Sequence, residues 1–458
     1  MIRLALPVMI LWWPAGTQAA TDRMTTITIQ DPVGDGLLPG PAEPHPSEVQ
    51  RRLIQESIDR NIVALESLGK LESFSLASPL LGWPLRPNNG LADFGYHGTA
   101  NFVDLDAAWP DHLLDYECGR RTYDLSNGYN HGGIDYINWP FWWNKMDRGE
   151  VAVIAAAPGI LIGTHDGEYD RSCGLNDNPW NAAYVMHADG SVAWYGHLKN
   201  GSVTARPVGS AIAQGEYLGL VGSSGSSFLP HLHFELHDAT GRVVEPHAGP
   251  CNPGASWWAS QRPYFDPAIN KMTAGFARPV PMSTCPTPEQ PNEATDFPPS
   301  GDIYLTTYYR DQRSLAFDPD GATMDRLYDP DGRLVAQWTQ TSPVDHYDVS
   351  YWYVRLSASQ GFDTGTYRWE ATYHGVTYVH TFTVSSDAGR YYGECIKGCD
   401  TSRQTCDGDC QDECRATRQG EREIGSCISE CKVLCIDDER ACKDTCQALK
   451  EAETVHEP

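Results

Sequence analysis

The sequence predicts a multidomain, mainly β protein: an antiparallel β domain, then a β-sandwich, then a C-terminal α-hairpin. Residues 78–278 and 300–386 contain short apolar runs separated by turn residues, a pattern typical of antiparallel strands. A Pro-rich stretch at 279–299 between them indicates a linker. Ten of the 14 cysteines fall between Cys395 and Cys446, a density that indicates a disulfide scaffold.

Residues 1–20 have the pattern of a secretory signal peptide. Arg3 gives a positive start, an apolar run follows at residues 4–13, and Thr-Gln-Ala-Ala at 17–20 offers a cleavage site. This apolar run is too short to span a bilayer, so we expect no stable membrane anchor. The mature chain is expected to be secreted or periplasmic, where disulfides persist.

Residues 21–77 are expected to form a lead-in that contains one helix. From Ser47 onwards, apolar residues recur at steps of four, four and three, which places them on one helical face. These residues are Ile54, Ile58, Ile62 and Leu65. The helix either packs on the next domain or belongs to a removable pro-segment, and the pattern does not decide between the two.

The strands of residues 78–278 are expected to be short. Residues 151–163 predict two strands around a Pro-Gly turn, and residues 183–187 and 192–197 predict a hairpin. We therefore expect an antiparallel β domain in this part of the chain.

Residues 300–386 alternate between apolar and polar positions in about six short runs. Turns are expected at 329–332, which reads Asp-Pro-Asp-Gly, and at His374 and Gly375. This many short strands in a segment of this length suggests an immunoglobulin-like β-sandwich.

Two histidine motifs carry the candidate chemistry. A His-Gly-Gly-Ile-Asp motif spans residues 131–135, and a His-Leu-His motif spans 231–233. The two histidines of the second motif lie on one face of a strand, because side chains alternate along it. Three nitrogen or oxygen ligands suit a catalytic zinc ion, which keeps its fourth position for water. With 15 histidines in the chain, either motif alone is weak evidence.

Two further segments strengthen the pattern. Tyr-Gly-His-Leu at residues 195–198 lies between the motifs, and a Gly- and Ser-rich run at 219–227 precedes the second one. In this order and spacing, the motifs closely resemble those of the lysostaphin-type (LytM-like) zinc metallopeptidases, a family of peptidoglycan endopeptidases. The likeness covers residues 130 to 240, so the antiparallel β domain is expected to be a metallopeptidase domain.

The resemblance implies roles for five residues. His131, Asp135 and His233 would bind one Zn²⁺ ion, and His197 and His231 would be the catalytic pair beside it. Zinc polarises a carbonyl and activates water. One neutral histidine can then take the proton of that water, and the second can donate to the developing oxyanion.

Two departures from the family pattern bear on substrate preference. Where the family commonly has Ser-Thr-Gly-Pro before its His-x-His motif, this chain has Phe228 and Leu229 in the middle two positions, and Leu229 is expected to add bulk at the groove wall. Residues 136–143 are unusually aromatic. They either line the substrate groove or pack an insertion against the sheet.

The four earlier cysteines are expected to form disulfides. Cys118–Cys173 and Cys251–Cys285 is the preferred pairing of the three that are possible. A metal role for these four is not expected, because the zinc site of the family does not use them.

The spacing of the ten late cysteines is a palindrome, with gaps of 4, 7, 4, 4, 13, 4, 4, 7 and 4. Steps of four and seven keep them on one helical face. Residues 387–458 are therefore expected to form a disulfide-laddered α-hairpin that turns near Gly420. The first of the ten cysteines pairs with the last, the second with the second last, and so on inwards. A metal cluster is the weaker alternative, because no histidine lies among these cysteines.

We therefore expect a secreted zinc metalloendopeptidase that hydrolyses peptide bonds in the cross-links of bacterial cell-wall peptidoglycan. An extracellular protease of Gly-rich proteins, and a non-catalytic cell-wall-binding or regulatory protein on the same fold, stay open as alternatives. With 34 Lys and Arg against 60 Asp and Glu, the net charge of −26 argues against a nucleic-acid partner. The oligomeric state cannot be inferred from the sequence.

Overall fold

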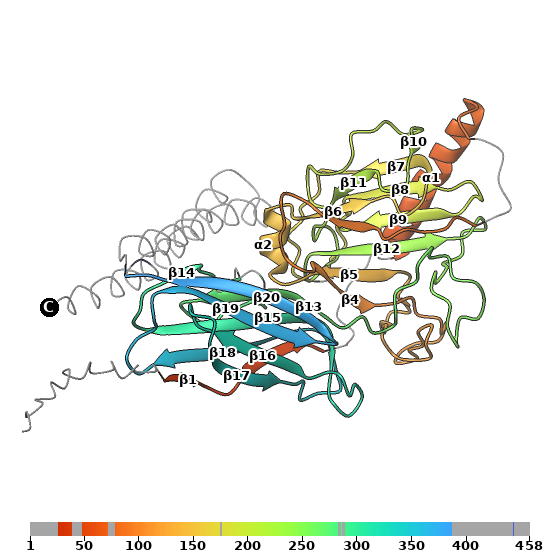
Figure 1. Cartoon of the computed structure of the whole chain (residues 1–458). Helices are drawn as coiled ribbons and strands as arrows, with labels where there is room; N and C mark the ends of the chain where they lie inside the picture. Colours follow the sequence, from red (N-terminus) through yellow and green to blue (C-terminus); the bar gives the residue numbers. More distant parts are fainter. Residues whose placement is uncertain are drawn as a thin grey trace, which may run out of the picture.

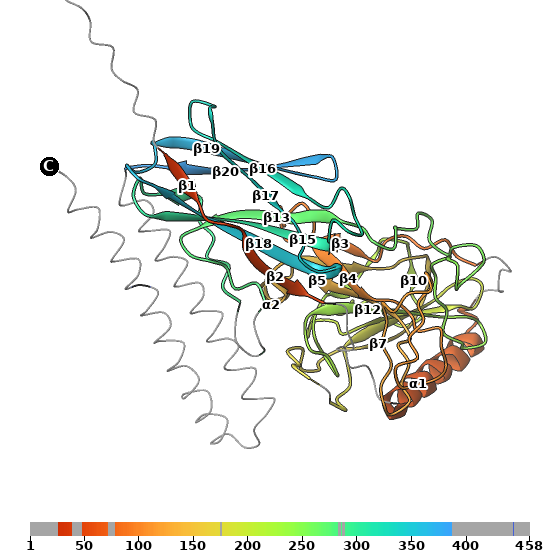
Figure 2. The same cartoon turned by 90° about the horizontal axis from the view of Figure 1, so that it is seen from below.

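The computed structural model describes residues 26–38, 48–71, 78–174, 176–282, 285, 289–386 and 443. The expected signal peptide and, apart from residue 443, the expected cysteine-rich hairpin lie outside these residues. Two β lobes lie side by side (Figures 1 and 2). The first lobe comprises residues 48–71 and 78–260 and contains all five candidate site residues, and the second comprises residues 26–38 together with the described residues from 268 to 386.

The first lobe is built on a seven-stranded antiparallel sheet with the order β10-β7-β8-β9-β12-β5-β4. The predicted hairpin is confirmed, because β8 pairs with β9. In sheet order, the strands are β10 (Ala211–Ile212), β7 (Gly159–His165), β8 (Ala182–Met186), β9 (Val192–Gly196), β12 (His231–His237), β5 (Ile134–Asn138) and β4 (His97–Asn101).

A three-stranded sheet packs against this large sheet. It consists of β11 (Tyr217–Leu220), β6 (Val151–Ile154) and β3 (Leu85–Pro87). The two strands predicted around the Pro-Gly turn therefore exist as β6 and β7, but they lie in different sheets. One apolar core joins the sheets, with Val153 and Leu218 from the small sheet against Ile134 and Leu232 from the large one.

Strand β12 shows how the sequence builds this core and the site together. Its apolar residues Leu232, Phe234 and Leu236 alternate with polar ones and face the core. Its polar residues, the two histidines of the second motif, Glu235 and His237, therefore extend from the opposite face. Every residue of β12 is buried, so that polar face is covered as well.

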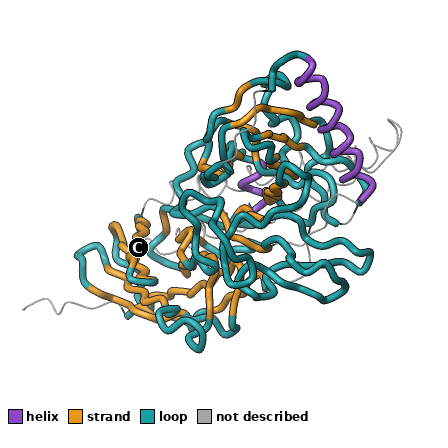
Figure 3. Tube along the Cα trace, turned by 90° about the vertical axis from the view of Figure 1, so that its right-hand side faces the viewer, coloured by secondary structure: helices purple, strands orange, loops and turns teal. Residues whose placement is uncertain are grey.

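The predicted helix is confirmed as α1 (Glu48–Ser67). Ile58 and Leu65 are buried on its apolar face and pack with Trp180, Tyr184 and Trp194 of the first lobe. Trp194 is directly opposite Glu235 in the pairing of β9 with β12. The helix therefore lies on the same face of the large sheet as the histidines, along the outer side of the lobe (Figure 3).

The second lobe consists of two five-stranded sheets that share one core. The first contains β1 (Ile27–Ile29), β2 (Val33–Leu37), β13 (Ala268–Gly275), β15 (Asp302–Arg313) and β18 (His346–Ala358). The second contains β14 (Asp296–Phe297), β16 (Thr323–Tyr328), β17 (Leu334–Gln340), β19 (Gly365–Tyr373) and β20 (Val376–Val384). The turns expected between β16 and β17 and between β19 and β20 are present.

The second lobe draws strands from beyond residues 300–386. From the lead-in, β1 and β2 pair with β18, and β13, from the range expected to be metallopeptidase domain, pairs with β15. From the expected linker, β14 pairs with β20. These distant strands pair there because an edge strand presents unpaired backbone N–H and C=O groups. Local sequence patterns do not specify which strand fills such a position.

An apolar cluster and a polar one join the two lobes. Residues 139–143, from the aromatic segment, are largely buried against Tyr308 and Val349 of the second lobe, together with the short helix α2 (Trp142–Asp147). The aromatic segment thus packs an interface between lobes. The Leu229 side chain is part of the same cluster, so its bulk packs at the interface between the lobes.

The four earlier cysteines pair differently from the preferred pairing. Cys118 bonds to Cys251 and Cys173 bonds to Cys285, so the pairing Cys118–Cys173 with Cys251–Cys285 is wrong. The loops of the first pair run together, since the backbone N–H of Cys251 donates to the carbonyl of Tyr116 at 3.0 Å. This contact joins distant segments, and cysteine order alone does not reveal it.

No helix within the described residues is long and apolar enough to cross a membrane.

The polar joint between the lobes is expected to contribute strongly to stability. The guanidinium of Arg121 pairs with Asp311 at 2.5 Å and Asp348 at 3.1 Å, and all three side chains are almost fully buried. Arg121→Met would leave the two carboxylates without this partner, and we expect it to lower the free energy of unfolding by about 3–5 kcal/mol. Urea denaturation would measure the change.

The matched control for this change is Arg242→Met, because Arg242 pairs with Asp238 at the surface and is 81% exposed. An exposed pair contributes less than about 1 kcal/mol, so this variant should unfold almost as the wild type does. Equal losses of stability in the two variants would contradict the role assigned to Arg121.

Candidate metal centre

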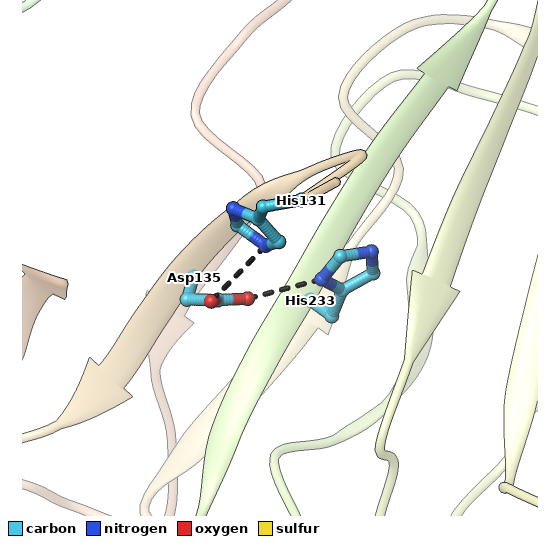
Figure 4. A group of neighbouring side chains, drawn as sticks. All are labelled: His131, Asp135 and His233. Carbon is cyan, nitrogen blue, oxygen red and sulfur yellow. Dashed lines mark hydrogen bonds and ion pairs between the residues drawn. The ribbon is translucent and has the colours of Figure 1, made fainter. Parts of the chain in front are cut away.

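The three candidate metal ligands come together in the structure. Nε2 of His131 lies 3.2 Å from one carboxylate oxygen of Asp135, and Nδ1 of His233 lies 3.0 Å from the other. Figure 4 shows the carboxylate between the two imidazoles. Donor atoms of all three residues lie within 4.8 Å of one another. The ligand set expected from the sequence thus converges in one place.

The pairing of β5 with β12 brings the two motifs together. Asp135 is directly opposite His233 in the antiparallel register, and cross-strand partners extend from the same face of a sheet. His131 lies just before the start of β5, in an irregular segment.

The two glycines of the first motif make room for the second motif. A Cβ atom at Gly133 would lie only 2.5 Å from Cε1 of the His233 ring. A Cβ atom at Gly132 would lie 3.2 Å from the carboxyl group of Glu235. Any larger residue at position 133 would therefore displace the imidazole from its place beside Asp135.

Each histidine of the ligand set is held by a hydrogen bond on the side away from Asp135. Nδ1 of His131 donates to the carbonyl of Phe102 at 2.6 Å, and Nε2 of His233 donates to Glu235 at 3.0 Å. These partners fix the tautomers, so Nε2 of His131 and Nδ1 of His233 are the nitrogens offered to a metal.

The donor set fits zinc. Two imidazole nitrogens and one carboxylate oxygen are typical ligands of a catalytic zinc ion. Ligand atoms at about 2.0–2.1 Å from one tetrahedral ion lie about 3.3 Å from each other. The distances of 3.2 and 3.0 Å from the Asp135 oxygens to the histidine nitrogens are close to that value.

The two candidate catalytic histidines lie beside this set. His197 follows β9 and His231 begins β12, and their ring centroids are 4.5 Å apart. Nδ1 of His197 donates to the carbonyl of Ser224 at 2.6 Å, and Nδ1 of His231 donates to that of Leu229 at 2.9 Å. Nε2 is therefore the proton-accepting nitrogen of each neutral ring.

Burial sets the protonation of this pair. Burial, reinforced by the neighbouring His231 and His233, lowers the pKa of His197 well below its usual value. Burial also lowers the pKa of His231, although the charge of Asp135 opposes the shift. Both imidazoles are therefore neutral at pH 7 and can accept a proton.

Glu235 belongs to the site, although it was not among the predicted residues. It holds His233, and strand alternation places it on the same face, so the pattern of β12 could have identified it. Its carboxylate forms a bidentate ion pair with Arg51 of α1, with one contact at 3.0 Å. Burial raises its pKa, but Arg51 and the hydrogen bonds of His233 and His237 outweigh this and hold it well below its usual value.

Aromatic rings pack around the candidate site. Tyr123 stacks on His131 with a centroid distance of 4.7 Å, and Trp180 contacts His197 edge-on at 4.9 Å. A Cβ atom at position 196 would lie 2.2 Å from the Trp180 ring, which explains the glycine before His197. The Tyr-Gly-His-Leu segment is thus shaped by the packing of Trp180.

A second cluster of potential ligands, formed by Asp311, His346 and Asp348, differs from this centre. The guanidinium of Arg121 contacts both carboxylates and supplies the positive charge that compensates theirs. The cluster is therefore part of the joint between the lobes.

Residues 131–246 match the model of Peptidase family M23, so this segment is a domain of that family. A stretch of 93 residues is 41% identical to the cell division protein DipM of Caulobacter vibrioides. That stretch covers 20% of this chain and only 14% of DipM.

Two solved structures are similar to part of the chain. A mutant catalytic domain of the prophage-encoded M23 protein EnpA from Enterococcus faecalis is 23% identical, with a TM-score of 0.21, over 37% of this chain and 94% of that one. The catalytic domain of the antimicrobial peptidase lysostaphin from Staphylococcus simulans is 20% identical, with a TM-score of 0.22, over 33% of this chain and 89% of that one.

Changes to the ligand set are expected to abolish tight zinc binding. His131→Ala and His233→Ala each leave two donors instead of three. Glu235→Gln keeps the donors but removes the charged acceptor that orients His233, and we expect it to weaken zinc binding by about 10- to 100-fold. Competition with a chromophoric chelator would measure the dissociation constants.

His165→Gln is the control for these variants, because His165 is a half-exposed histidine at the end of β7. It should bind zinc as the wild type does. Zinc bound equally tightly by His131→Ala would rule out the proposed ligand set.

Proposed function

We propose that this protein is a zinc metalloendopeptidase that hydrolyses peptide bonds in the cross-links of bacterial cell-wall peptidoglycan. One observation carries the proposal: within a segment that matches Peptidase family M23, a His-Asp-His donor set lies beside a second pair of histidines. A donor set alone would suit a structural metal, whereas the adjoining pair supplies the proton transfers that peptide hydrolysis requires.

The residues divide the chemistry between them. A zinc ion held by His131, Asp135 and His233 would act as a Lewis acid that polarises a carbonyl and lowers the pKa of water. One imidazole of the pair His197 and His231 takes the proton of the attacking water on Nε2 and returns it to the leaving amine. The ring that carries this proton on Nε2 can also donate a hydrogen bond to the negative charge on the carbonyl oxygen before the proton passes to the amine.

The proposed substrate class follows from the motifs and the family match at residues 131–246. The net charge of −26 gives no attraction to a wall polymer that is itself anionic. We therefore assign substrate recognition to the residues around the metal centre and to the accessory parts of the chain.

The remaining parts are assigned as the sequence suggests. Residues 1–20 direct export, so the protein acts outside the cytoplasm, in the periplasm or as a secreted enzyme. The second lobe is an immunoglobulin-like sandwich. For residues 387–458, which apart from residue 443 lie outside the described residues, we propose a disulfide-laddered hairpin whose bridges would replace an apolar core. The metallopeptidase unit is assigned to the first lobe, because β13 from the range 78–278 and β14 from the range 279–299 belong to the second lobe.

The activity can be tested with purified peptidoglycan and mass spectrometry of the released peptides. The expected products carry new amino and carboxyl termini, and chelation should abolish their release. His197→Ala and His231→Ala are each expected to lower the rate by at least about 100-fold because they remove a proton-transfer group, while zinc remains bound.

Three outcomes would contradict this proposal. Release that survives both chelation and His131→Ala would refute the zinc mechanism. Cleavage of a Gly-rich protein without release of wall peptides would favour a broader protease. Zinc binding without cleavage of either substrate, including by the α1 variants described below, would favour a non-catalytic role.

The disulfide pairing proposed for residues 387–458 can be tested independently by peptide mapping without reduction. Pairing first with last predicts the outermost bridge between Cys395 and Cys446 and the innermost between Cys414 and Cys427. A bridge within one helix, such as Cys395 to Cys399, would contradict the ladder.

A further inference from the structure

Helix α1 crosses the face of the large sheet on which the proposed chemistry takes place. Near its start, Arg51 contacts Glu235 on β12. Further along, the amide of Asn61 donates to the carbonyl of Ile162 on β7 at 2.8 Å. Near its end, Leu65 packs on Gly209, next to β10. A Cβ atom added at Gly209 would lie only 2.7 Å from the Leu65 side chain. The helix therefore spans the sheet from the site strand towards the opposite edge.

The first turns of α1 are joined to the candidate metal centre. Arg51 forms its bidentate ion pair with Glu235, which in turn accepts the hydrogen bond from His233. The guanidinium also lies 5.4 Å from the ring centroid of Trp194 and 5.9 Å from that of Tyr129. Only one residue thus separates the helix from a proposed zinc ligand.

The site is closed in this arrangement. All five candidate site residues, His131, Asp135, His197, His231 and His233, have a relative exposure of 0%. A peptide bond must touch the metal and the catalytic pair to be hydrolysed, so some covering segment has to leave first.

Among the described segments around the site, α1 is the one best suited to leave. The loops that carry Tyr123 and Trp180 follow Cys118 and Cys173, and both cysteines are fastened by disulfides. In contrast, α1 pairs with no strand and is held by side-chain contacts, chiefly its apolar face and Arg51. Its departure would break no β ladder.

We propose that α1 is an inhibitory element that covers the active-site face, with the Arg51–Glu235 ion pair as its fastening at the metal centre. The proposal rests on the proposed peptidase function, because it regulates that same site. Displacement of α1 opens the metal centre to substrate. It also uncovers an aromatic surface that includes Tyr184 and Trp194, which lies beside the centre and is available to the bound substrate.

The proposal can be tested by displacing the helix through Ile58→Asp, which places a charge in the contact with the sheet. Val63→Asp is the matched control, because Val63 is on the same helix and 64% exposed. Carbethoxylation of His197 and His231, read by mass spectrometry with the half-exposed His165 as internal standard, reports access to the site independently of activity. Wall-peptide release is measured on the same samples.

Ile58→Asp is expected to raise both histidine labelling and wall-peptide release by at least about tenfold, and Val63→Asp should change neither. Arg51→Gln, which keeps the apolar face of the helix, should give a smaller increase in both. A synthetic peptide of residues 48–71 should restore inhibition of Ile58→Asp. Thermal unfolding verifies that each variant is folded, and Arg51→Gln decides the matter if Ile58→Asp is not.

The outcomes separate this proposal from the proposed function. Unchanged labelling in folded Ile58→Asp and Arg51→Gln would overturn the inhibitory role. Increased labelling with a lower rate than wild type would also overturn it, because α1 would then position His233 through Glu235. Increased labelling without hydrolysis in any variant would refute the peptidase function while supporting occlusion by α1.

Discussion

The register of β12 against β5 and β9 is the constraint on which the candidate site depends. It sets Asp135 and Gly196 on either side of His233, so that His197 follows directly beside the ligand set. A slip of one residue would turn the histidines into the apolar core and Leu232 and its neighbours out of it. Burial of that apolar row thus fixes the register, and the fold and the site are stabilised by the same contacts.

Features that depend on local periodicity could be predicted from the sequence. The helical spacing around Ile58 gave α1, and strand alternation with turn residues gave β8, β9 and the strands from 302 to 384. The metal-ligand set could be proposed because the motifs at 131–135 and 231–233 resemble those of a known family, which implies the roles of their residues. The spacing of the histidines alone did not assign these roles.

Contacts between distant segments could not be predicted in this way. The cysteine pairing failed because it depends on which loops meet, and the membership of β1, β2 and β13 in the second lobe depends on sheet positions left open by other strands. Arg51 has no motif of its own. Its role follows only from the placement of α1 across the site, where a buried carboxylate needs a cation.

The two-lobe arrangement has a consequence for any movement of α1. The chain preceding the helix is fastened to the second lobe, where β2 pairs with β18, and β2 ends at Leu37 while α1 begins at Glu48. The lobes are themselves joined by Arg121 and by the aromatic cluster. A displaced helix therefore stays tethered near its own binding face, at an effective concentration of the order of millimolar. Closure is then intramolecular, so opening is reversible as long as the chain is intact. Only proteolysis, or a ligand that competes for the same face, would keep the site open.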